Sequence, residues 1–166
     1  MEIKEGAFLF VKQSFFDSFP NGNFSINKVL PDGTVHKRPC FFVFCDAKTG
    51  LLWCVPISSR TDKYREIMEQ KIRKNGRCDT IIIGKIFNRE SAFLIQNMFP
   101  VTEQYLDGVY LDRYHHPVVA DSVSAKSVSS SARRVLALAR QGKVLTFTDI
   151  LSIEKYLLTQ TTNHPR

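Results

Sequence analysis

Long hydrophobic runs are missing from this sequence of 166 residues. No segment approaches the roughly 18 to 20 apolar residues that a membrane-spanning helix requires. The longest N-terminal run, from Ala7 to Val11, is too short for the core of a signal peptide. We therefore expect no membrane span and a cytoplasmic protein.

The sequence also lacks any Cys-x-x-Cys pair, which argues against a zinc ribbon or a thioredoxin-like site. Its four cysteines are Cys40, Cys45, Cys54 and Cys78, and three of them lie in strongly apolar segments. Free cysteines are commonly buried, so we expect small core residues and no disulfide framework.

One other group of residues suggests a metal, because His115 and His116 lie near Asp112 and Asp121. Neighbouring side chains of an extended chain point in opposite directions, however, so the two histidines do not chelate together easily. A surface loop or a contact with RNA is the other interpretation. We expect no metal and no cofactor.

Acidic residues are few relative to basic ones, 16 against 23, which gives a net charge of +7 and a pI near 9.4. Such an excess favours a polyanionic partner, either nucleic acid or an anionic membrane face. Apolar residues make up 43%, enough for a core, and the length fits one domain over residues 1–166.

Apolar runs and turn signals predict a chain rich in strands that ends in helices. A loop is expected over 17–37, a helix over 61–74 and final helices over 122–140 and 149–158, while strands are expected over 6–16, 40–45, 51–57, 80–86 and 91–95. The fold class is therefore α+β, with an antiparallel sheet or barrel core over about 5–105 and C-terminal helices over about 122–158.

The most informative stretch covers residues 36–60. Arg38 precedes one expected strand, and Ser58 and Ser59 follow the next. Because these two ends of an antiparallel hairpin meet, a guanidinium and two hydroxyls come together at one end of the sheet. The planar fork of arginine suits phosphate oxygens, and hydroxyls can donate to the same phosphate. The alternative without a functional role is a solvated arginine next to two serines in a turn.

Basic residues cluster around this hairpin and along the following helix. The candidate RNA-binding residues are Lys37, Arg60, Lys63, Arg65, Lys71, Lys74 and Lys85. We expect Lys63, Lys71 and Lys74 on or near the exposed side of the helix, and a solvated helix face is the competing interpretation. Lys85 is equally a strand-edge charge.

Aromatic residues offer surfaces on which unpaired bases can stack, and the candidates are Tyr64, Tyr105, Tyr110 and Tyr114. Tyr64 lies on the apolar stripe of the helix over 61–74, which favours core packing instead. Trp53, in the middle of an expected strand, is interpreted as a core residue.

The hairpin resembles a known family. The succession Arg38-Pro39, an apolar strand, Lys48-Thr49-Gly50, a strand ending in Cys54-Val55-Pro56 and two hydroxyl residues resembles the MazF/Kid (PemK-like) toxin endoribonucleases. Segments 37–39, 56–59, 76–80 and 93–100 look closer to the ToxN/AbiQ/CptN toxins of type III toxin–antitoxin systems.

This resemblance implies a small SH3-like antiparallel β-barrel with added helices. It implies a sequence-preferring, metal-independent endoribonuclease that acts on target mRNA and leaves 2′,3′-cyclic phosphate and 5′-OH ends. The implied partner is an RNA antitoxin, a pseudoknot made as repeats, which the toxin cuts and binds in a toxin–RNA hetero-oligomer.

Within the resemblance, Ser59 matches the serine that the ToxN-like toxins need most, and Ser58 matches their preceding threonine. Arg38 stands where the ToxN-like toxins carry a lysine and the MazF-like toxins an arginine. The lysine that follows the serine has no clean match, because Arg60 is one residue early and Lys63 two residues late. These matches imply Ser59, Ser58 and Arg38 as catalytic residues.

Two further interpretations of the sequence stay open. His36, two residues before Arg38, is either a general base or a loop histidine. A non-catalytic RNA-binding module on the same barrel is the alternative to an enzyme. A DNA-binding regulator, using the C-terminal helices around Arg133 and Arg134, is a third.

Overall fold

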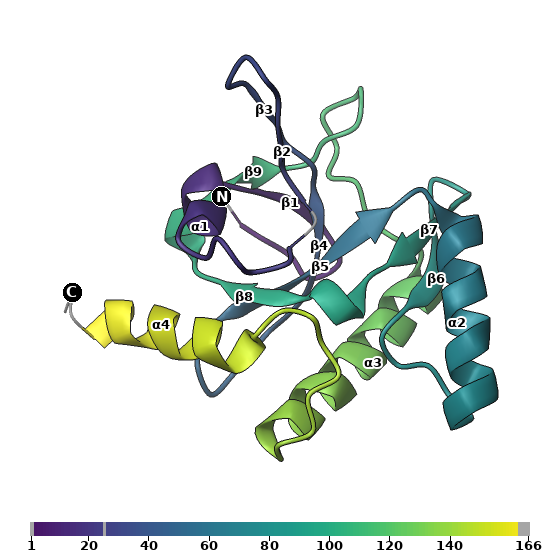
Figure 1. Ribbon diagram of the computed structural model, residues 1–166. Helices are drawn as coiled ribbons and strands as arrows, with labels where there is room; N and C mark the ends of the chain where they lie inside the picture. The colour runs from purple at the N-terminus through teal and green to yellow at the C-terminus, as the bar shows by residue number, and fades with distance from the viewer. Residues whose placement is uncertain (1, 25, 163–166) are drawn as a thin grey trace.

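The computed structural model describes residues 2–24 and 26–162 (Figure 1). Strands and helices alternate irregularly along the chain, and four helices lie around a mostly antiparallel sheet, which confirms the α+β class. The strands are β1 (Phe8–Val11), β2 (Lys28–Val29), β3 (Val35–His36), β4 (Cys40–Cys45), β5 (Leu52–Ser58), β6 (Ile82–Ile86), β7 (Arg89–Phe93), β8 (Phe99–Val101) and β9 (Leu106–Val109). The helices are α1 (Gln13–Asp17), α2 (Thr61–Asn75), α3 (Ser122–Arg140) and α4 (Ile150–Thr162), with short 3₁₀ turns η1 (Ile95–Asn97) and η2 (Glu103–Tyr105).

The main sheet has the order β6-β7-β5-β4-β1-β9, and β8 pairs with the first half of β5. Among the described residues this path ends at β6 and β9 and does not close, so a closed SH3-like barrel is not confirmed. The segment after Pro117 makes two isolated bridges. Ala120 bridges to Ile86 in β6, and Val119 bridges to Ala7, just before β1. Isolated bridges of this kind do not add a strand that would complete a barrel.

The central hairpin agrees with the sequence prediction. Cys40 pairs with Pro56 and Cys45 with Leu52, and the turn between the strands ends at Gly50, whose φ is +73°. Only glycine adopts this left-handed conformation without a steric cost. The helix expected over 61–74 is α2, which ends at Gly76 with φ +78°, the left-handed conformation common after the last turn of a helix.

The strand expected over 6–16 is wrong beyond Val11, because the chain turns into α1. A helical turn lets the adjacent rings of Phe15 and Phe16 both reach the core, where each packs against Phe24 and Phe99. A continuing strand would place two neighbouring side chains on opposite faces. The loop expected over 17–37 contains the projecting β2–β3 hairpin (Figure 1).

Two hydrophobic clusters hold the elements together. One lies between the sheet and α3, through Val128, Ala132 and Val135, and includes the fully buried Trp53, as expected. The other gathers α1, β8 and α4 around Phe15. The helix over 149–158 is confirmed but extends to Thr162, and its Tyr156 is 41% exposed and contacts the ring of Phe19.

A partly buried ion network links both C-terminal helices to the hairpin. Arg140, at the end of α3, donates to Asp46 in the hairpin turn and to Glu154 on α4, each at 2.6 Å. Burial raises the pKa of the Asp46 carboxyl, but the hydrogen bonds from Arg140 and the Lys48 N–H outweigh it, so this pKa lies below its ordinary value of 3.8.

The cysteines do not all lie in the core. Cys40 and Cys54 are buried, whereas Cys45 is exposed and Cys78 is half-buried. Cys45 is the last residue of β4, where the alternation of side chains directs it outward. None of the described helices is long and apolar enough to cross a membrane.

Candidate phosphate-binding site

The pairing of β4 with β5 brings the two ends of the hairpin together. Because Cys40 lies opposite Pro56, the chain before β4 runs beside the end of β5. Arg38, Ser58 and Arg60 line one cavity of about 510 Å³ at this place. The juxtaposition of an arginine and a serine hydroxyl, predicted from the hairpin, is therefore present in the fold.

The cavity carries uncompensated positive charge. Lys28, Arg38 and Arg60 all line it, and within the described part of the chain none of the three forms an ion pair. Cations that have no protein carboxylate nearby create a local field that attracts anions. Arginine forks match phosphate oxygens in shape as well as in charge.

Ser58 contributes its hydroxyl to this cavity. Its Oγ accepts a hydrogen bond from the Arg60 N–H at 3.2 Å, so its own O–H can still donate to a ligand. Ser59 differs: it is exposed and does not line the cavity, and its carbonyl accepts the N–H of Thr61. The structure brings Ser58 rather than Ser59 to Arg38, since successive side chains leave a strand on opposite sides.

Asn27 fixes the backbone beside the cavity. Its Oδ1 accepts the N–H of Arg38 at 3.3 Å, while its Nδ2 donates to the carbonyl of Val11 at 3.3 Å and to Oε1 of Gln13 at 3.2 Å. The start of β4 is thereby linked to the end of β1. Sequence reasoning missed Asn27, because a single asparagine in a loop gives no signal of what its amide will bind.

The loop before Phe24 forms one wall of the cavity. A Cβ on Gly22 would lie 2.0 Å from Cε2 of Phe24, whose ring is packed against other phenylalanines and has little room to move. Asn23 has a φ of +56°, and its carbonyl accepts Nδ2 of Asn97 at 2.7 Å. This wall is therefore a fixed part of the fold, and the Asn21-Gly22 pair indicated only a turn.

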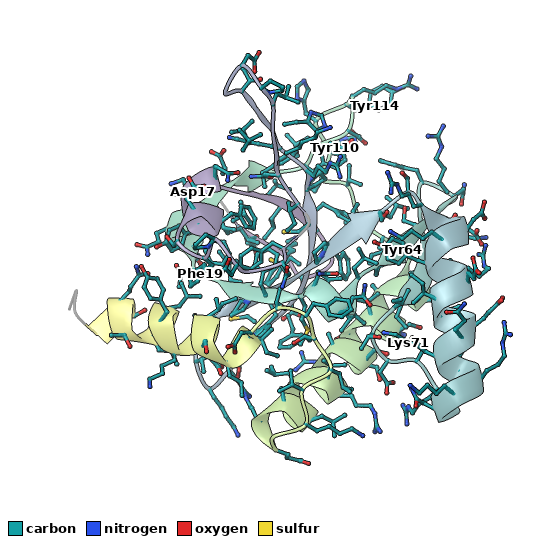
Figure 2. The ribbon with its side chains drawn as sticks, in the orientation of Figure 1. Asp17, Phe19, Tyr64, Lys71, Tyr110 and Tyr114 are labelled. Atoms are coloured by element: carbon teal, nitrogen blue, oxygen red, sulfur yellow. The ribbon has the colours of Figure 1, made fainter. Side chains whose placement is uncertain are left out.

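Three predicted RNA-binding residues are engaged by the protein itself. Lys37 is ion-paired with Asp107, and Arg65 contacts Glu90 at 2.8 Å. Nζ of Lys71 donates to Oγ1 of Thr80 at 2.8 Å and to Oε1 of Gln96 at 3.4 Å. Lys71 (Figure 2) is thus half-buried and bound by the protein itself, although we expected it on or near the exposed side of the helix.

Three other predicted RNA-binding residues are exposed and lie outside the cavity. Lys63 and Lys74 are exposed at the two ends of α2, and Lys63 lies over the Tyr64 ring at 5.3 Å. Lys85 is exposed on the edge strand β6, where Asp121 interacts with it electrostatically. None of the three lines the cavity.

The candidate stacking residues fall into two groups (Figure 2). Tyr64 is half-buried and lines the cavity, and Tyr105 donates its hydroxyl to Gln160. Tyr110 and Tyr114 are exposed on the other side of β1, and Arg113 lies 4.8 Å from the ring of Tyr114. Only Tyr64 belongs to the site at Arg38.

The histidines lie outside the cavity. His36 is exposed on β3, where it pairs with Lys28, and so it neighbours a lining residue without being one. Asp112 accepts the backbone N–H groups of His116 and Tyr114, and these bonds lower the pKa of its carboxyl. Among the described residues no three His, Cys, Asp or Glu side chains group in a way that could hold a metal ion.

Comparison with known proteins gives little beyond this geometry. No protein-family model matches the sequence, and no curated protein matches it. One solved structure belongs to work on bacterial type III toxin–antitoxin systems and selective toxin inhibition by a non-coding RNA pseudoknot. It aligns with 95% of this chain and 73% of its own, at 18% identity and a TM-score of 0.40. Similarity this low carries no argument about function.

Proposed function

We propose that the protein is a metal-independent endoribonuclease toxin that cleaves target mRNA in the cavity at Arg38 and Ser58. One observation carries the proposal: three cations without ion pairs and a serine hydroxyl with a free proton line the same cavity. An RNA backbone supplies the anion that such a cavity favours.

The proposed reaction uses the 2′-hydroxyl of the substrate as nucleophile. The 2′-oxygen forms a bond to phosphorus, the bond from phosphorus to the 5′-oxygen breaks, and the products are a 2′,3′-cyclic phosphate and a 5′-OH. Arg38 stabilises the charge of the phosphorane, and Ser58 donates to a non-bridging oxygen. In this proposal Ser59 has no direct contact with the phosphate.

Proton transfer needs groups other than arginine, which stays protonated in proteins. No carboxylate or imidazole of the described residues lines the cavity. The proposal therefore assigns proton donation to the leaving 5′-oxygen to the ammonium of Lys28, which lines the cavity, and removal of the 2′-OH proton to water.

The unpaired cations of the cavity also support one alternative, a non-catalytic RNA-binding module. A cavity with cations but without a carboxylate or imidazole is also what a non-catalytic RNA-binding module requires, because phosphate binding needs no proton transfer. The placement of Ser59 outside the cavity points the same way.

The RNA antitoxin in this proposal rests on the sequence resemblance. A pseudoknot RNA would bind over the basic residues and form a toxin–RNA hetero-oligomer that blocks the cavity. Tandem short repeats followed by a terminator, directly upstream of the gene, are the expected source of such an RNA.

Incubation of the purified protein with end-labelled single-stranded RNA in EDTA tests the activity. We expect discrete fragments with 2′,3′-cyclic phosphate ends. Tight binding of intact RNA without any cleavage would select the binding module, and cleavage only with added Mg²⁺ would refute the proposed mechanism.

A further inference from the structure

The loop between α3 and α4 presents an aromatic ring to solvent while its backbone is held in place. Phe147 is 63% exposed. Its N–H donates to the carbonyl of Gln96 at 2.8 Å, and its carbonyl accepts Nδ2 of Asn23 at 3.4 Å. The exposure of the ring is therefore a property of a fixed loop.

The next residue anchors the same loop. Thr148 is buried, and its Oγ1 donates to the carbonyl of Met98 at 2.7 Å. Thr146 in turn donates to the carbonyl of Thr148 at 2.7 Å. With anchors on both sides, the backbone of Phe147 is held at a place where its ring is exposed, so water covers a large apolar surface at an unfavourable free energy.

The backbone of Phe147 lies beside the wall of the cavity at Arg38. Asn23, which bonds the Phe147 carbonyl, itself lines that cavity together with Arg38 and Ser58. The α3–α4 loop thus lies one hydrogen bond from the cavity wall. An RNA strand that continued from the cavity past Asn23 would come to this loop.

We propose that Phe147 is a stacking platform for an unpaired base of the RNA whose phosphate lies in the cavity. The inference rests on the proposed function, because it assumes that RNA is the anion. A single strand carries a flat base beside every phosphate, and any base can stack on an aromatic ring. The cations of the cavity favour this ligand over an apolar segment of a protein. The C-terminal helices then act in substrate binding by placing Phe147.

Equilibrium binding to a fluorescein-labelled single-stranded RNA of roughly 12 nucleotides, within the usual site sizes for such proteins, tests the platform. Phe147→Ala should weaken binding about tenfold, whereas Phe147→Trp should bind like the wild type because it keeps a ring. Val144→Ala is the matched control, because Val144 is 60% exposed on the same loop, and it should change nothing.

A second RNA of the same length, with abasic sites, separates stacking from other contacts. The wild type should bind it about tenfold more weakly than the intact RNA, and Phe147→Ala should bind both RNAs alike. Phe147→Ala binding intact RNA as tightly as the wild type, or Val144→Ala losing as much, would overturn the platform while wild-type cleavage kept the proposed function. If the wild type neither binds nor cleaves RNA, both proposals fall.

Discussion

Two cavities of the molecule differ more in charge than in size. The cavity beside η2, lined by Lys12, Glu103 and Tyr105, has a volume of about 830 Å³, against about 510 Å³ for the cavity at Arg38 and Ser58. Nζ of Lys12 donates to the carbonyl of Gln104 at 2.9 Å, and a carboxylate shares that cavity. The larger cavity therefore holds its cation in a hydrogen bond and balances its charge.

The smaller cavity keeps its charge available. Its three cations make no ion pair in the described residues, although the chain provides partners for comparable side chains such as Lys37 and Arg65. Unpaired cations repel one another, and an arrangement of this kind is stabilised when an anion binds. The unbalanced charge of the smaller cavity, and not its volume, is therefore what supports it as the proposed anion site.

The largest expected effect comes from removing one cation from each of the two cavities and comparing the rates of RNA cleavage. Arg38→Ala should lower the single-turnover rate of RNA cleavage at saturating enzyme by 10² or more, on the order expected for a lost transition-state contact. Lys12→Ala removes a cation from the other cavity and should leave that rate unchanged. Equal rates for Arg38→Ala and the wild type, once RNA is bound, would make Arg38 an affinity residue only.

A smaller effect distinguishes the two neighbouring serines. Ser58→Ala should lower the cleavage rate roughly 10- to 100-fold, because in the proposed reaction Ser58 donates to a non-bridging oxygen, and Ser59→Ala should change it little. The sequence resemblance implies the opposite order, so single-turnover kinetics of the two variants decide between them. Thermal unfolding of both proteins checks that neither change acts through stability.

The local parts of this fold were predictable from the sequence, since their signals lie within a few residues of one another. The apolar runs on either side of Gly50 predicted β4 and β5, and the helix expected over 61–74 is α2. From the hairpin alone, the meeting of Arg38 with the end of β5 followed.

Contacts between distant segments were not predictable. The wall formed by Gly22 and Phe24 depends on rings from α1 and β8. The carbonyl of Phe147 accepts a hydrogen bond from Asn23, which is 124 residues away in the sequence. The open sheet likewise depends on contacts between segments that are far apart in the sequence. The edge strand β6 meets a single bridge from Ala120, and Val119 bridges to Ala7 before β1. No local pattern in the sequence predicts such pairings.

The last and smallest expected effect tests the same distinction between free and engaged cations on α2. Lys74 is exposed in the last turn, whereas Lys71 donates to Thr80 and Gln96. A free cation that contacts phosphate releases a counterion, so Lys74→Ala should reduce the slope of log K against log salt by roughly 0.7 to 0.9 and leave stability unchanged.

Lys71→Ala should act in the reverse way. It leaves the buried Oε1 of Gln96 without its donor and should lower the free energy of unfolding by about 1–2 kcal/mol. Its slope against salt should equal that of the wild type, because its ammonium already serves the protein. RNA binding over a salt series and urea unfolding of both variants measure the two quantities. A flattened salt dependence for Lys71→Ala with full stability would show that Lys71 leaves Gln96 to bind RNA, and that a hydrogen bond in the free protein does not disqualify a cation from the interface.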